Sequence, residues 1–148
     1  MDDASLTSWV TLQAVYGVGD RTLLKLIHAF GAPDAVLSAT RDDLIGVGCS
    51  PELAESVRRG PESSVRRQID GQVKTVERLK IQTVTLFDRS YPARLKAIPD
   101  PPPLLYVSGS VLLKDEVAVA IVGGRRATPS GRLITEEIAK DLAGCGVT

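Results

Sequence analysis

The feature that most constrains the fold of this chain is the stretch 117–131, VAVAIVGGRRATPSG. It opens with an apolar run, 117–122, which does not alternate with polar residues, so we expect a strand buried on both faces, as in a parallel sheet. Further on, Thr128-Pro129 is typical of a helix start, with threonine as the cap and proline in the first turn. The stretch predicts a strand, a turn and a helix over 130–143.

The turn between that strand and that helix has the composition of an anion-binding site. Glycine lets the backbone approach an anion, a helix N-terminus attracts it, and arginine offers forked donors to phosphate oxygens. The glycines are adjacent, so their spacing fits neither the dinucleotide fingerprint nor the P-loop. A tight turn whose arginines face water is the alternative. The candidate phosphate-binding residues are Gly123, Gly124, Arg125, Arg126 and Thr128.

A second basic surface is expected on a helix over residues 62–80, the clearest amphipathic pattern in the chain. Its apolar residues share one face of a helical wheel, and three basic residues share the opposite face. A solvated outer face is the alternative to a stripe that tracks phosphates. The apolar set is Val65, Ile69, Val73, Val76 and Leu79, and the basic set, which adds weaker candidates for phosphate contact, is Arg67, Lys74 and Arg78.

The charges are unevenly distributed, although 18 basic and 18 acidic residues give a net charge of zero. Residues 1–57 contain 3 Lys/Arg and 8 Asp/Glu, a net of −5, whereas residues 58–96 contain 10 and 4, a net of +6. A basic middle segment favours an anionic partner.

The first part of the chain, residues 6–57, predicts short helices joined by two Gly-Val-Gly turns at 17–19 and 46–48. Asp34 and Ser50 are the expected N-caps of two of these helices. We expect the glycine turns to serve packing or protein contacts rather than to clamp DNA, because the surrounding residues are acidic. Gly60-Pro61 is the expected domain boundary.

Residues 83–87 and 104–107 are strand-like, and the five residues 99–103 between them include four prolines, which exclude a helix. Val147-Thr148 is expected to begin another strand. The two cysteines, Cys49 and Cys145, are expected to be reduced, buried thiols. His28 lies within a helical pattern and lacks partners at metal-ligand spacing, so we expect no metal site, catalytic set or cofactor.

Several motifs of the second half occur in a specific order. They are Tyr91-Pro92, Ile98-Pro99-Asp100-Pro101, Leu104-Leu105-Tyr106 with Gly109, and the run from Val119 to Pro129 with Gly131. This order resembles the DNA-processing protein A family (DprA, also called Smf), and the preceding helices match it as well. At Gly124 the family usually has serine, so one hydroxyl donor is absent from the turn.

The resemblance implies an α/β fold, in which residues 1–60 form a SAM-like, helix-hairpin-helix-like module and residues 61–148 the first part of a Rossmann-like parallel sheet. It also implies a bacterial protein without enzymatic activity that binds and protects single-stranded DNA and loads the recombinase RecA during natural transformation. Because the family continues with further strands, we expect this chain to be an N-terminal portion. A homodimer through the missing part of the Rossmann domain stays open.

Two other function classes stay open. A Rossmann-like enzyme, such as a nucleoside-monophosphate phosphoribohydrolase, also holds phosphates in a glycine-rich turn. The acidic residues 1–60 could alternatively dock a protein. No apolar run approaches the length of a membrane helix and the N-terminus lacks a signal-peptide pattern, so we expect a cytoplasmic protein without membrane contact.

Overall fold

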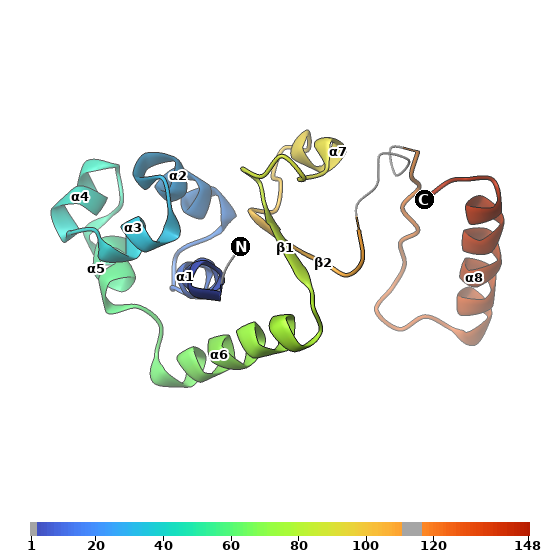
Figure 1. Ribbon diagram of the computed structural model, residues 1–148, viewed down its shortest axis with the longest axis horizontal. Coiled ribbons are helices and arrows are strands. Elements are labelled where there is room, and N and C mark those ends of the chain that lie inside the picture. The colour runs from blue at the N-terminus through green and yellow to red at the C-terminus, as the bar shows by residue number, and fades with distance from the viewer. Residues whose placement is uncertain (1–2, 111–116) are drawn as a thin grey trace. The chain divides into compact units, whose positions relative to one another are not determined.

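The computed structural model describes residues 3–110 and 117–148 (Figure 1). They form two compact units divided after Gly109. Together they combine helices with a small β-sheet, which confirms a mixed α/β composition. The division at residue 60 into a helical module and a sheet-forming part stays a prediction.

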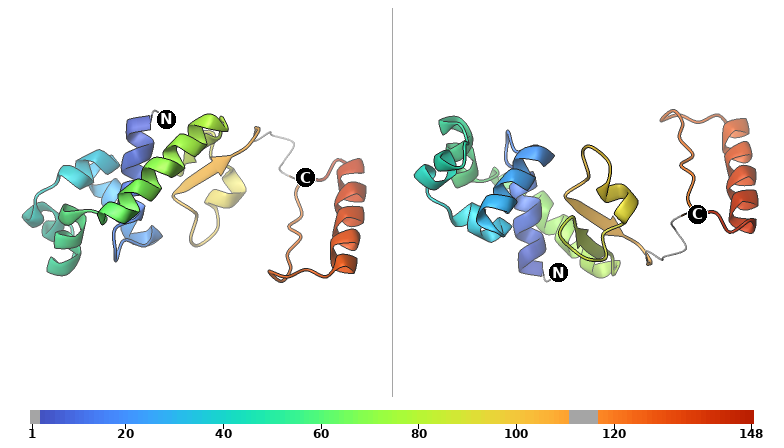
Figure 2. Two further views of the ribbon diagram at one scale, coloured as in Figure 1. Left: turned by 90° about the horizontal axis from the view of Figure 1, so that it is seen from below. Right: turned by 90° about the horizontal axis from the view of Figure 1, so that it is seen from above.

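The first unit begins with six helices that confirm the expected helical character of residues 6–57 and 62–80. α1 lies at the centre of this group, because it packs against α2, α3 and α6 (Figures 1 and 2). Its Trp9 and Leu12 side chains are buried in the core. The helices are α1 (Asp3–Gln13), α2 (Asp20–Phe30), α3 (Pro33–Ser38), α4 (Arg41–Gly46), α5 (Pro51–Arg59) and α6 (Ser63–Arg78).

Short polar side chains start several of these helices. Ser50 caps α5 as expected, accepting a hydrogen bond from the Leu53 N–H at 3.2 Å. The expected cap at Asp34 is wrong, because Pro33 starts α3 one residue earlier and places Asp34 in the first turn. The Asp34 carboxylate instead accepts a hydrogen bond from the Ser8 hydroxyl of α1, which ties the two helices together.

Helix α6 closes the core of the first unit. Ile69, Val73 and Val76 are buried against the cluster that contains α1, so the core is continuous across Gly60-Pro61. The expected place of Leu79 on this apolar face is wrong. Leu79 follows the last helical residue and is 57% exposed, since the chain turns away there towards the sheet.

The sheet of the first unit consists of two short strands, β1 (Gln82–Thr85) and β2 (Leu104–Val107), close to the expected ranges. They pair antiparallel, with Thr83 opposite Tyr106, so these two strands do not have the parallel pairing expected from the sequence. The connection contains α7 (Ala93–Lys96) and is fixed by Tyr91, whose hydroxyl donates to the Pro102 carbonyl at 2.8 Å. Burial of that ring raises the pKa of Tyr91.

The second unit contains α8 (Pro129–Gly144), which confirms the expected helix. The expected buried strand at 117–122 is wrong: these residues adopt no strand and their side chains are exposed, because the described residues provide no layer that covers them. Two backbone hydrogen bonds in this unit have the pattern of a parallel sheet. Thr148 N–H donates to the Val117 carbonyl and Val119 N–H to the Thr148 carbonyl, each at 2.9 Å, as in a parallel ladder.

Candidate nucleic-acid interface

The turn before α8 presents open backbone and two exposed arginines. A Cβ atom added at Gly123 or Gly124 would meet no other atom of the described residues within 4 Å. Arg125 and Arg126 are exposed. The turn therefore offers backbone N–H groups and two guanidinium groups to an incoming anion, at the end of a helix that attracts negative charge.

Thr128 fixes the start of α8, as expected. Its hydroxyl oxygen accepts a hydrogen bond from the Gly131 N–H at 3.1 Å, and Pro129 occupies the first turn. A Cβ atom at Gly131 would lie 3.2 Å from that oxygen, so glycine suits the tight cap. Because the oxygen acts only as an acceptor within the cap, the hydroxyl proton remains available for donation to a ligand.

The second set of candidates lies in the other unit, on the exposed face of α6. Arg67, Lys74 and Arg78 are all exposed, on the side of the helix opposite the buried Ile69 and Val73. They are separated by seven and four residues, so they form one row along the helix. The structure thus groups the candidates into a turn in the second unit and a row in the first.

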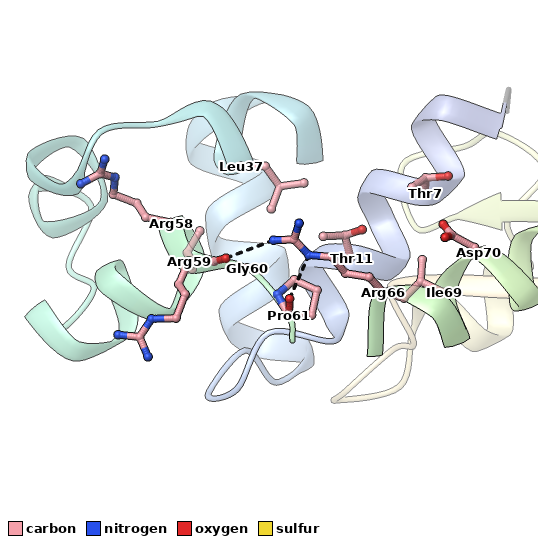
Figure 3. A pocket seen from close by; sticks show the side chains of 11 residues that line it. Thr7, Thr11, Leu37, Arg58, Arg59, Gly60, Pro61, Arg66, Ile69 and Asp70 are labelled. Carbon is pink, nitrogen blue, oxygen red and sulfur yellow. Dashed lines mark hydrogen bonds between the residues drawn. The ribbon is translucent and has the colours of Figure 1, made fainter. Parts of the chain in front are cut away.

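Arg66 was not predicted to have a role of its own, because it reads as one more charge on an outer face. Its Nε donates to the Pro61 carbonyl at 2.9 Å and its Nη2 to the Arg59 carbonyl at 3.3 Å. It thereby fixes the corner between α5 and α6, at the edge of a cavity of about 390 Å³ (Figure 3). Arg58 and Arg59 direct their guanidinium groups outward, on the side away from Asp70.

The two Gly-Val-Gly turns differ in conformation. The left-handed residue is the first glycine in one turn, Gly17 at φ 88°, and the last glycine in the other, Gly48 at φ 86°. Each is covered by the helix that follows the other turn. A Cβ atom at Gly17 would lie 3.3 Å from a Leu53 methyl group, and one at Gly48 would lie 2.9 Å from the Lys25 Nζ. These glycines therefore allow α5 to approach the first turn and α2 to approach the second turn closely.

The remaining reactive side chains form no centre in the described part of the chain. His28 is exposed on α2, and no group of three His, Cys, Asp or Glu residues there could hold a metal ion. Both cysteines are free, but Cys145 is exposed, so its expected burial is wrong; it follows the last residue of α8. Partial burial raises the pKa of Cys49, and nearby Lys25 partly offsets this.

Comparison with known proteins identifies the family. The family model described as DNA recombination-mediator protein A matches residues 82–148, which include the turn before α8. Protein Smf of Borreliella burgdorferi is 33% identical over 124 residues, which cover 84% of this chain and 38% of that protein. The chain therefore belongs to the DNA-processing protein A (DprA/Smf) family of DNA recombination mediators. It spans about two fifths of the length of this relative.

No helix among the described residues combines the length and the apolar character needed to cross a membrane.

Proposed function

We propose that this chain is the portion of a recombination mediator that holds single-stranded DNA by its phosphates, through the turn formed by Gly123, Gly124, Arg125, Arg126 and Thr128. The observation that carries the proposal is the open glycine backbone beside two exposed arginines at a capped helix start, within the segment that the mediator family matches. Arg67, Lys74 and Arg78 would add contacts to the same backbone.

The architecture proposed for this role is a SAM-like module followed by a Rossmann-like sheet. The parallel hydrogen bonds of Thr148 with Val117 and Val119 support the second part, because a strand, a helix and a parallel return are its repeating unit. In such sheets ligands bind at the carboxyl ends of the strands, and the glycine-arginine turn follows the segment whose Val117 and Val119 make these parallel hydrogen bonds.

The whole protein would protect the bound strand in the cytoplasm and transfer it to the recombinase RecA during natural transformation. This role is a binding function and needs no catalysis. The nucleoside-monophosphate phosphoribohydrolase alternative gains no support from the family match. A homodimer would belong to parts of the protein outside this chain.

The test is the salt dependence of binding to a labelled oligo(dT). Arg125→Ala and Arg126→Ala should weaken binding and each reduce the salt slope by roughly 0.7, because fewer counterions are released from the strand. The matched control is Lys140→Ala, which changes an exposed residue in the later part of α8, the helix that follows the turn. It should leave the salt slope unchanged. Wild-type affinity and slope in both arginine variants would contradict the proposed site.

A further inference from the structure

A shallow groove lies beside α6 in the first unit, and the phosphate site proposed above does not use it. Its volume is about 350 Å³ and its lining is mostly apolar. The groove runs between one side of the helix and the second strand. Its residues are Gly71, Gln72, Thr75 and Val76 of α6, Ile81 after the helix, and Tyr106 of β2.

Tyr106 contributes an accessible aromatic ring to this groove. It is 41% exposed, whereas Leu104, two residues earlier and on the same face of β2, is buried in the core. The Tyr106 hydroxyl accepts a hydrogen bond from Gln72 Nε2 at 2.8 Å, so the ring is held in place by α6. A fixed, half-exposed ring of this kind can stack on a planar ligand with little loss of side-chain entropy.

Gly71 is the second unusual residue of the groove. It lies inside a helix of 16 residues, where glycine is unfavourable compared with alanine. Its φ is not positive, and a Cβ atom there would meet no other atom of the described residues within 4 Å. Neither backbone conformation nor internal packing requires glycine at this position. What glycine provides is a flat patch on which another backbone can lie closely.

The basic row borders this flat patch. Gly71 follows Arg67 by four residues and precedes Lys74 by three and Arg78 by seven, so it lies within the row. A phosphate backbone that follows the row of basic residues would therefore pass over Gly71, next to the Tyr106 ring. A basic track combined with an aromatic platform is the arrangement that binds single-stranded nucleic acid without sequence preference.

We propose that the groove between α6 and β2 is a base-stacking subsite for single-stranded DNA, in which one base stacks on Tyr106 while the phosphate backbone crosses α6 at Gly71. The occupant is a nucleobase of a polyanion, because the apolar groove lies directly beside a row of positive charge. This inference rests on the proposed function and adds to it a contact with the base rather than with the phosphate.

The test compares Tyr106→Leu with Tyr106→Phe in the full chain. Tyr106→Leu removes the ring and should weaken oligo(dT) binding roughly tenfold, within the range for loss of one stacked base. Tyr106→Phe keeps the ring and should bind within about twofold of the wild type. Neither variant removes a charge, so the salt slope should stay constant. Wild-type affinity in a folded Tyr106→Leu variant would overturn the subsite.

An oligonucleotide with abasic sites separates this inference from the proposed function. The wild type should lose affinity for it, and Tyr106→Leu should bind it as well as the wild type does. If the wild type binds neither oligonucleotide, the proposed function fails; if it binds both equally, only the subsite fails.

A second variant keeps the test independent of any folding defect at Tyr106. Gly71→Leu places a side chain on the flat patch at an exposed helical position, so it should keep or raise the melting temperature while weakening binding roughly tenfold. Ser64→Leu, exposed on the same helix outside the groove, is the control. Unchanged oligo(dT) affinity in Gly71→Leu would contradict the proposal.

Discussion

Arg21 and Asp100, which are 79 residues apart in sequence, form a two-pronged ion pair that joins α2 to the proline-rich segment before β2. Arg21 Nε lies 2.8 Å from Asp100 Oδ1, and Arg21 Nη2 lies 3.3 Å from Oδ2. Hydrogen bonds and charge from Arg21 lower the pKa of the Asp100 carboxyl group. The same contact raises the pKa of Arg21. The pair connects the helices of the first unit to the segment that leads into its sheet.

Replacement of Asp100 by asparagine should therefore reduce stability in a pH-dependent way. Because the folded pKa of Asp100 lies below the ordinary value of 3.8, its contribution is present above pH 3.8 and is lost as pH falls through the lowered value. Urea unfolding of Asp100→Asn and wild type should differ at pH 7 and converge below pH 3.8. A difference that grows on acidification would contradict this reading. High salt should also reduce the difference in stability between the two proteins at pH 7, since both side chains of the ion pair are exposed.

The two glycines of the second Gly-Val-Gly turn should respond oppositely to alanine. Gly48→Ala forces a left-handed φ on a residue with a Cβ atom and pushes that atom towards Lys25, so it should destabilise the fold by about 1–2 kcal/mol. Gly46 ends α4 with open space around it. Gly46→Ala should be neutral or stabilise by up to about 1 kcal/mol. Chemical denaturation of both variants measures this, and equal effects would contradict the assigned conformations.

Two neighbouring arginines of α6 should separate stability from DNA binding. Arg66→Ala removes both hydrogen bonds to the carbonyls of Pro61 and Arg59 and should cost about 1–2 kcal/mol of unfolding free energy. Arg67 makes no hydrogen bond or ion pair within the described residues, so Arg67→Ala should change stability by less than about 0.5 kcal/mol. It should instead weaken oligo(dT) binding. The reverse pattern would exclude Arg67 from the interface.

Introduction of serine at Gly124 should strengthen DNA binding. The resemblance to the DprA/Smf family implies serine at this position, and the open space around Gly124 accommodates a side chain. A hydroxyl donor to a phosphate oxygen should tighten oligo(dT) binding roughly fivefold. Gly144→Ser, at the far end of α8, is the control and should leave the affinity unchanged. Weaker binding by Gly124→Ser would mean that the turn needs bare backbone at this position.

The sequence predicted helices and strands well where their formation depends only on residues close together in the chain. The helices α6 and α8, the caps at Ser50 and Thr128 and both strands follow from periodicity and from residues that start helices. The predictions fail where a contact between residues distant in sequence determines the local structure. Asp34 bonds Ser8 instead of capping its helix.

The same limit applies to burial and to the candidate sites. The pattern at 117–122 indicates the burial that a covering layer would give, and the described residues contain no such layer. The row of Arg67, Lys74 and Arg78 could be predicted because it depends on one helix. The groove could not, because Gly71 and Tyr106 are 35 residues apart and meet only through the packing of α6 beside β2.

The packing of α6 on α1 has a consequence for synthesis of the chain on the ribosome. About 65 residues must be added after Gln13 before α6 is complete at Arg78, which takes roughly 3–13 seconds at bacterial and eukaryotic elongation rates. During that interval α2 to α5 can form local contacts, but the side of α1 that α6 covers still faces solvent. The emerging chain would therefore expose an apolar surface for chaperones until its sixth helix leaves the exit tunnel.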